Sequence, residues 1–246
     1  MIAVAVMAAA SQTAAQKPAF DVASIKASNP SANGGFIRPV GDRLTASNVP
    51  LKLLVVYAYR AGDGSSFLNS QLLGGPDWLD KERFDVEAKA AVQPRTSDDF
   101  RPMVQALMAE RFKLVVHRET RDLPVFALVV GKNGAKLKNS DPDAPEGGSV
   151  RSSADGLHME TKKGSMAALA RQLSSSAGRP VIDKTGLAGT YEYTLNWFPV
   201  TQIPAPESKV PSLFIAVQEQ LGLRLDSTTA PQEVLVIDSV SKPSEN

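Results

Sequence analysis

Residues 74–88 read GGPDWLDKERFDVEA, and residues 186–195 read GLAGTYEYTL. In each stretch glycines lead into a segment of alternating apolar and polar residues, with Phe84, Val86 and Ala88 on one side in the first. Alternation with a period of two is typical of a strand with one buried face. Phe84 corresponds to Tyr191, a separation of 191 − 84 = 107 positions. The pattern therefore predicts the same glycine-led strand twice in one chain.

An amphipathic helix precedes the first of these strands. Four apolar residues recur there at helical spacing: Leu51, Leu54, Val55 and Ala58. Such spacing places one apolar stripe on a helix. Asn48 is the expected N-cap, because its side chain can accept a hydrogen bond from a free N–H of the first turn.

The second half repeats this helix with the same spacing, at Met166, Leu169, Ala170 and Leu173. Ser165 is the expected N-cap, and Gly178 is expected to end the helix. Leu54 corresponds to Leu169, a separation of 169 − 54 = 115 positions. The separations differ between elements, which indicates that the loops differ in length while the order of elements repeats.

Each half then continues with a second helix and a closing strand. The helices are indicated by two apolar sets: Met103, Ala106 and Leu107, and Leu213, Phe214, Val217 and Leu221. Closing strands are predicted at Val125–Val130 and Val234–Ile237, each after a turn that contains a proline, Pro124 or Pro231.

These elements predict an α+β protein of two similar βαβ-type halves, each a small sheet with two helices on one face. The first half is residues 17–138 with an extra N-terminal strand at 20–25, the linker is 139–154, and the second half is 155–246. Chance recurrence is the alternative interpretation, because βαβ units are common.

The N-terminus indicates export. Ile2 to Ala10 form a short apolar run, followed by small and polar residues, which is typical of a signal peptide over residues 1–16. No Lys or Arg precedes the run, which is the pattern expected of a signal peptide truncated at its start. A buried N-terminal element is the alternative. We expect a periplasmic or secreted protein. No later stretch is apolar enough to predict a transmembrane segment.

Composition narrows the functional classes. The formal net charge of the 246 residues is +1, which gives no general attraction to nucleic acid. Cysteine is absent, and this excludes disulfides, thiolate metal sites and thiol catalysis. No P-loop is present, and we predict no cofactor. Asp183-Lys184-Thr185-Gly186 spells the phosphorylated tetrapeptide of ion-pumping ATPases, but a strand followed by a turn explains it better.

Both histidines begin a His-x-Glu triplet, His117 to Glu119 and His158 to Glu160. Residues two apart on a strand face the same way, so each triplet could present an imidazole beside a carboxylate. These four residues are weak candidates for zinc binding or acid–base catalysis. Polar alternation on a half-exposed strand explains them equally, so we predict no metal site and no catalytic residue.

The candidate ligand-binding residues lie at the two glycine-led turns and just after the second strand. They are Asp77, Trp78, Lys184 and Trp197. Large aromatic side chains most often pack against other residues of the protein. For both tryptophans the alternative is that the ring contacts a ligand.

Several motifs resemble one family of proteins. They are Phe20–Lys26, Gly74–Leu79, Glu110–Leu114, Arg179–Leu187, Gln220–Leu223 and Lys242–Asn246. On these motifs the chain resembles an uncharacterised, soil-associated family of exported proteins that is expanded in acidobacteria. The resemblance implies export and no established activity, substrate or catalytic residue. The order of helices and strands is also similar to the short N-terminal domain of secretins and TonB-dependent receptors, which mediates protein contacts.

We therefore expect an exported, non-catalytic recognition or sensory module that binds a protein, a peptide or a cell-envelope component, and not nucleic acid. The alternative is a secreted hydrolase with an unmarked, possibly metal-assisted site that uses His117 and Glu119. The sequence has no Gly-x-Ser-x-Gly nucleophile elbow, the motif by which many serine hydrolases are found.

Overall fold

A computed structural model describes residues 18–29, 34–153, 156–198 and 210–243. The predicted signal peptide and residues 199–209 lie outside these residues. The chain divides into two compact units. Unit 1 comprises the described residues within 1–58, 78–113 and 241–246, and unit 2 those within 59–77 and 114–240.

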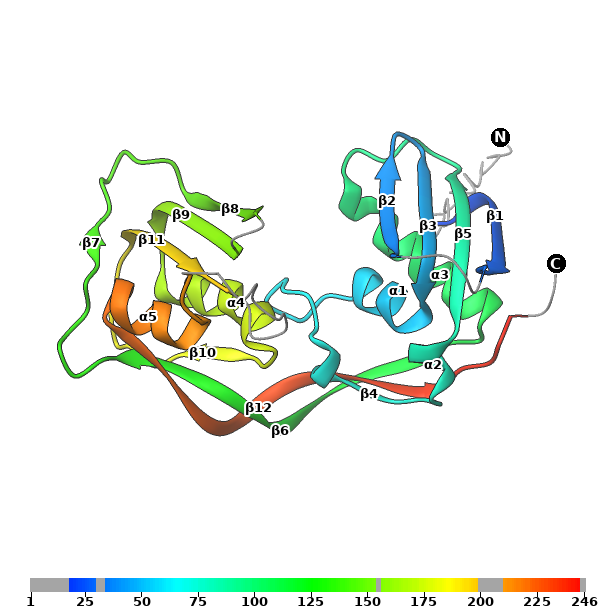
Figure 1. Ribbon diagram of the computed structural model, residues 1–246. Coiled ribbons are helices and arrows are strands. Elements are labelled where there is room, and N and C mark those ends of the chain that lie inside the picture. The colour runs from blue at the N-terminus through cyan, green and yellow to red at the C-terminus, as the bar shows by residue number, and fades with distance from the viewer. Residues whose placement is uncertain (1–17, 30–33, 154–155, 199–209, 244–246) are drawn as a thin grey trace, which may run out of the picture. The chain divides into compact units, whose positions relative to one another are not determined.

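Unit 1 contains one antiparallel sheet of order β1-β5-β3-β2. Its strands are β1 (Phe20–Ala27), β2 (Phe36–Val40), β3 (Arg43–Pro50) and β5 (Arg83–Ala90). Its helices are α1 (Leu51–Ala58), α2 (Trp78–Lys81) and α3 (Phe100–Arg111), with a short 3-10 turn, η2 (Ser97–Asp99), before α3. In Figure 1, α1 and α3 lie on one face of this sheet. The predicted buried side of β5 is confirmed, since its alternate residues Phe84, Val86 and Ala88 are buried.

Asn48 does not cap α1, so that prediction is wrong. The helix begins at Leu51, and Asn48 lies in β3 with a φ of 51°. The Asp85 carboxylate of the neighbouring strand accepts a hydrogen bond from the Asn48 N–H at 2.7 Å and from the hydroxyls of Ser28 and Ser47. These bonds, led by the one from Asn48, lower the pKa of Asp85. Asparagine tolerates the left-handed region better than most residues, so it suits a break in strand register.

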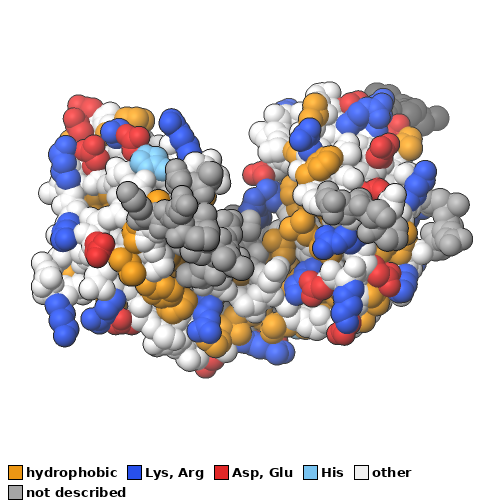
Figure 2. Space-filling view, viewed as in Figure 1, with side chains coloured by type: hydrophobic (Ala, Val, Ile, Leu, Met, Phe, Trp, Pro, Cys, Tyr) orange, Lys and Arg blue, Asp and Glu red, His pale blue; other side chains and the backbone are white. Residues whose placement is uncertain are grey.

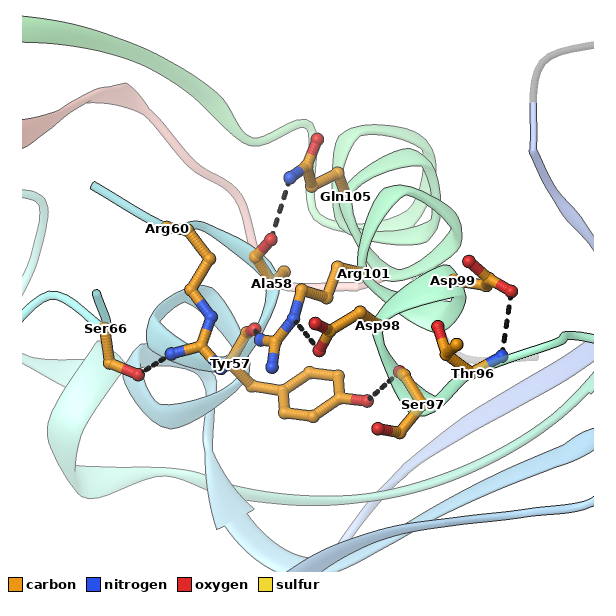
Figure 3. A network of polar contacts seen from close by, with 10 residues as sticks. All are labelled: Tyr57, Ala58, Arg60, Ser66, Thr96, Ser97, Asp98, Asp99, Arg101 and Gln105. Carbon is orange, nitrogen blue, oxygen red and sulfur yellow. Dashed lines mark hydrogen bonds and ion pairs between the residues drawn. The ribbon is translucent and has the colours of Figure 1, made fainter. Parts of the chain in front are cut away.

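Side chains of α3 satisfy the last carbonyl groups of α1 (Figure 3). Arg101 donates to the Tyr57 carbonyl oxygen, and Gln105 donates to the Ala58 carbonyl oxygen at 2.8 Å. The Arg101 guanidinium also bonds Asp98 at 2.8 Å and lies 4.9 Å from the centroid of the Tyr57 ring. Terminal helix carbonyls lack partners within the helix, so this network stabilises the end of α1.

Unit 2 contains two four-stranded sheets. The first has the order β7-β11-β9-β8 and consists of β7 (Lys138–Asn139), β8 (Gly147–Ser153), β9 (Gly156–Gly164) and β11 (Tyr191–Trp197). The second has the order β10-β6-β12-β4 and consists of β4 (Leu72–Gly74), β6 (Val115–Val130), β10 (Val181–Asp183) and β12 (Leu223–Ser239). The helices are α4 (Met166–Ala177) and α5 (Leu213–Leu221), and the 3-10 turn η1 (Asn69–Gln71) precedes β4.

The helices of unit 2 pack against both of its sheets. Buried residues of α4 and α5 share one hydrophobic core with Met159 and Leu195 of the first sheet and with Leu128 and Leu223 of the second. The Ser165 hydroxyl caps α4 by accepting from the Ala168 N–H at 3.2 Å, as predicted. The predicted apolar stripe of α4 is buried, and Gly178 ends the helix in the left-handed conformation that favours glycine.

The closing strands are much longer than predicted. β6 and β12 pair antiparallel along almost their whole lengths, and Pro124 and Pro231 lie inside them instead of in turns. Proline has no N–H to donate, so it fits a strand only where one edge is open. The third strands, β10 and β4, contact β6 only at 126–128 and β12 only at 235–237. Both prolines thus lie where the ribbon has two strands.

The α+β class is confirmed, and the described residues form three four-stranded sheets and five α-helices. The prediction of one small sheet for each half omitted the sheet that β6 and β12 build together. The boundaries of the predicted halves at 138 and 155 stay a prediction. None of the helices in the described parts of the chain combines the length and apolar character needed to cross a membrane.

Candidate functional site

The inner face of the sheet β7-β11-β9-β8 provides the floor of a hollow in unit 2. Strand register places Trp197 opposite Leu157, and Met159 opposite both Leu195 and Val150. Because side chains alternate along a strand, these residues share one face, and α4 and α5 pack against it. Figure 2 shows Lys, Arg, Asp and Glu side chains interspersed with apolar ones on the viewed surface. Because these charges are mixed, a hollow in the surface indicates a binding site better than the net charge does.

Two hollows adjoin α4, with volumes of about 440 Å³ and about 340 Å³. Both are lined by Arg171 and Gln172 of α4 and by residues of the edge strand β8 and of β9. We call the two hollows together the β8–α4 groove. Ligand sites in proteins commonly enclose about 300–1,000 Å³ and combine an apolar lining with a few polar groups.

The larger hollow has an apolar floor. The lining residues of this kind are Leu68, Val150, Leu157, Met159, Pro180, Val181 and Trp197. Trp197 is 1% exposed, and its indole N–H has no hydrogen-bond partner among the described residues. Buried polar atoms are nearly always bonded, so this N–H is an unusual feature of the floor.

Arg171 provides the positive charge on the wall that the two hollows share. It is exposed and forms no ion pair or hydrogen bond with any residue that the structure describes. Asp63 lines the larger hollow as well. Hydrogen bonding to Ser65, and more weakly the charge of Arg171, lower the pKa of Asp63, so its carboxylate is ionised at neutral pH. The groove can therefore accept a negative group at Arg171 and a hydrogen-bond donor at Asp63.

Three consecutive serines of α4, Ser174 to Ser176, line the larger hollow. The Ser174 hydroxyl donates to the Ala170 carbonyl at 3.0 Å and accepts from the Val181 N–H at 2.9 Å. This second bond joins α4 to the start of β10. Serine is a poor helix former in a helix interior, so the serine run was the signal in the sequence that this helix face is special. Arg171, Asp63 and Met159 were not among the predicted site residues.

Of the predicted ligand-binding residues, only Trp197 lines the groove. Lys184 is exposed in the turn after β10, where its backbone N–H donates to the Leu128 carbonyl at 2.9 Å. The Asp183 carboxylate accepts from the N–H and the hydroxyl of Thr185, which makes the tetrapeptide at 183–186 a turn, as expected.

Trp78 and Asp77 lie at the boundary between the segments of the two units. Trp78 begins α2 in unit 1, is partly buried, and contacts the Phe84 ring edge-to-face with centroids 6.4 Å apart. Asp77 is exposed and is the last residue of a unit 2 segment. The ring contact gives Trp78 a packing role; a ligand-binding role for Trp78, Asp77 and Lys184 stays a prediction.

His117 lies between two carboxylates. Its Nδ1 is 2.8 Å from Asp238 on β12, and its Nε2 is 3.7 Å from Glu119, the partner that the sequence predicted. The hydrogen bond with Asp238, followed by the charges of Asp238 and Glu119, raises the pKa of His117. Both ring nitrogens face carboxylates, and a protonated imidazole cannot bind a metal. Across the described ranges, no three His, Asp or Glu side chains gather in a way that could hold a metal ion.

We predict that His117 titrates above 6.5, the ordinary value for histidine. In an NMR titration, Asp238→Asn is expected to lower the pKa of His117 toward that value, and Glu119→Gln to lower it less. Because the folded-state pKa is raised, the pair stabilises the fold fully below the unfolded-state pKa, and this stabilisation is lost as pH rises through the folded-state pKa. An unchanged titration in Asp238→Asn would contradict the assignment.

The second triplet has a different arrangement. His158 and Glu160 lie on the outer face of β9, where His158 Nδ1 hydrogen-bonds the Asn196 side chain and Glu160 forms an ion pair with Lys162 at 2.8 Å. Their side chains thus bond neighbours on the sheet surface, away from the groove. A hydrolase that uses His117 and Glu119 stays an untested alternative.

Fold and groove together define an α+β protein with a concave, mixed apolar and polar site in its second unit. Residues 52–240 match the family described as Protein of unknown function (DUF3738), and the chain belongs to this family. No curated protein matches the chain, and no solved structure matches it.

Proposed function

We propose that this protein is an exported, non-catalytic recognition or sensory module whose β8–α4 groove binds a protein, a peptide or a cell-envelope component. The observation that carries the proposal is the groove itself, in which a buried apolar floor at Trp197 and Met159 lies beside Arg171, a cation without an ion-pair partner among the described residues. Burial of apolar surface provides affinity, and a few polar groups fix the orientation of a ligand.

The polar groups of the groove favour binding chemistry. The polar side chains of the larger hollow are a guanidinium, amides, hydroxyls and the Asp63 carboxylate, and the hydroxyls of Ser174 and Ser175 are hydrogen-bonded to helix carbonyls. The smaller hollow adds the charged side chains of Glu146 and Lys163. A general base or nucleophile needs a titratable group near its working pH. The one carboxylate of the larger hollow, Asp63, has its pKa lowered, which makes it a weak base and a good hydrogen-bond acceptor.

Action outside the cytoplasm is supported by the sequence pattern of residues 1–16. A role in recognition is also consistent with an internal duplication, which we propose for the whole chain. Three observations support the duplication. The orders β3-α1-β4-β5-α3-β6 and β9-α4-β10-β11-α5-β12 correspond once the four-residue helix α2, which has no counterpart between β10 and β11, is set aside. The sheets β1-β5-β3-β2 and β7-β11-β9-β8 then correspond strand by strand, and β4 and β10 occupy equivalent outer positions beside β12 and β6.

The groove is tested by comparing three proteins as baits in a cell-envelope and culture-fluid extract: wild type, Arg171→Glu and Arg151→Glu. Arg151 is the matched control, because it lies on β8 but opposite His158, on the outer face of the sheet. We expect a defined component to be retained by wild type and by Arg151→Glu and to be lost with Arg171→Glu. Retention that is the same with all three proteins would place recognition elsewhere.

A further inference from the structure

We infer that the β8–α4 groove takes an extended peptide segment, which adds to the edge of β8 as a further strand and places a large apolar side chain in the hollow at Trp197 and a carboxylate at Arg171. The inference rests on the proposed recognition function and names its ligand class. It follows from the position of β8 in the sheet, from the side of β8 that faces α4, and from the charge at the groove wall.

β8 is the outermost strand of its sheet. Among the described residues it pairs only with β9, and all seven of its residues are exposed. An edge strand presents unpaired N–H and C=O groups at regular spacing. An extended peptide can satisfy these groups by strand addition, a recurring mode of peptide recognition in which main-chain bonds give affinity and side-chain pockets give specificity.

The inner side of β8 opens into the groove. Gly148 and Val150 pair with Thr161 and Met159, whose side chains are buried on the inner face, and Val150 lines the larger hollow while Gly148 lines the smaller one. A strand added beside β8 would direct every second side chain toward the same face. Alternate residues of the peptide would therefore reach the two hollows in turn.

Gly148 shows how closely the inner face is packed at the smaller hollow. A Cβ built there would lie 2.4 Å from the Thr161 hydroxyl oxygen. The smaller hollow, with Lys163 and Thr190 in its lining, is polar, whereas the larger one has the apolar floor. The peptide is thus expected to carry one large apolar side chain, located at the Trp197 end.

Arg171 is the charged residue common to both hollows, whereas Asp63 lines only the larger one and Glu146 and Lys163 line only the smaller one. Arg171 has no ion-pair partner in the part of the chain that the structure describes. A guanidinium binds a carboxylate through two parallel hydrogen bonds. The side chain of an acidic residue and a C-terminal carboxylate offer the same chemistry, so the peptide carries one of them next to its apolar residue.

The test begins with selection from a random linear dodecapeptide library on the wild-type protein, followed by synthesis of enriched sequences with free and amidated C-termini. Affinities are measured by Trp197 emission in a Trp78→Phe background, which leaves one tryptophan of the two in the chain. We expect enriched peptides to share a large apolar residue beside an acidic one. Amidation weakens binding only if the terminal carboxylate is the group that Arg171 binds.

Two comparisons make the inference falsifiable. Arg171→Glu is expected to weaken binding by about tenfold or more, the effect of losing a charge-assisted hydrogen bond, while Arg151→Glu leaves it unchanged. Two sets of N-methylated peptides are compared, one methylated at odd-numbered residues and one at even-numbered residues. Only every second N–H of an added antiparallel strand faces β8, so one set is expected to lose binding and the other to keep it.

Failure of this inference and failure of the proposed function are distinguishable. If no peptide is enriched, or N-methylation has no effect in either register, strand addition is wrong even where Arg171→Glu still abolishes retention of an envelope component. If enriched peptides bind Arg171→Glu as well as wild type, the groove is not their site.

Discussion

Replacing Trp197 with alanine is expected to lower the free energy of unfolding by about 3–5 kcal/mol, the range for truncating a large buried aromatic residue. Trp197 is 1% exposed and belongs to the core cluster that joins α4 and α5 to both sheets of unit 2. The hollow beside it already holds about 440 Å³, so the truncated site would merge with an existing space instead of collapsing. Urea denaturation followed by far-ultraviolet circular dichroism measures the change.

Two controls separate the causes of this loss. Trp197→Phe keeps most of the ring and removes an indole N–H that has no described partner, so no hydrogen bond is lost and the cost should be well below that of alanine. Trp78→Ala removes a partly buried ring in unit 1 and should also cost less. A Trp197→Ala loss of under about 1 kcal/mol would show that the core repacks freely around the hollow.

The two tryptophans illustrate what the sequence could and could not predict. Both lie near glycine-led turns, so the local pattern predicted the same two roles, packing or ligand binding, for each of them. Strand register in the structure distinguishes the two residues. Trp197 is at an inward position of β11, opposite Leu157, whereas Trp78 begins a four-residue helix. Which face of a sheet is covered depends on where distant helices pack, and the local sequence does not contain that information.

Helices and their ends were predicted well where the signal is local. The apolar stripes of α1 and α4, the Ser165 cap and the Gly178 end depend on residues within four positions of one another. Asn48 failed as a predicted cap because its partners, Asp85 among them, are far away in the sequence. The same asparagine chemistry that caps a helix also serves a left-handed position in a strand.

Much of the groove could not be predicted, because it is assembled from four separate stretches of chain. Arg171 and the serine run lie on α4, Asp63 on the segment before η1, and Val150 in a stretch interpreted as a linker. The residues at 139–154 are rich in proline and glycine, which predicted a loop, yet β8 forms there by pairing with β9. Edge strands have weak sequence signals, since only one side of them is paired.

The long ribbon of β6 and β12 was hidden by its two prolines, which normally mark turns. In the sheet built on this ribbon, each predicted half also pairs one short strand with the long strand of the other, and the sequence could not show this exchange. β10 follows α4 of the second half but pairs with β6 of the first, and β4 of the first half pairs with β12 of the second. The two predicted halves therefore contribute two strands each to the sheet β10-β6-β12-β4.

This exchange predicts that neither predicted half keeps its strands of the shared sheet when it is alone. A fragment of residues 1–132 would keep β4 and β6 but lose β12, the partner of both, and a fragment of residues 133–246 would lose β6 and β4. The buried residues Val125, Leu128 and Leu235 would become exposed. Exposed strand edges with apolar faces associate or aggregate. The 133–246 fragment is therefore expected to lack a cooperative unfolding transition as a monomer, and the 1–132 fragment to keep unit 1 but lose the strand structure of β4 and β6. The two fragments mixed together are expected to form a 1:1 complex.

Size-exclusion chromatography with light scattering, together with circular dichroism, distinguishes the outcomes. The cut at 132–133 lies between exposed residues of a turn after β6, and a full-length chain nicked at that position is the control for damage by the cut itself. If the duplication is genuine, β6 can stand in for β12, and the 1–132 fragment at high concentration should form a two-fold dimer through its own β4 and β6. A monomeric 1–132 fragment whose β4 and β6 amides stay protected from hydrogen exchange would contradict both the shared sheet and the duplication.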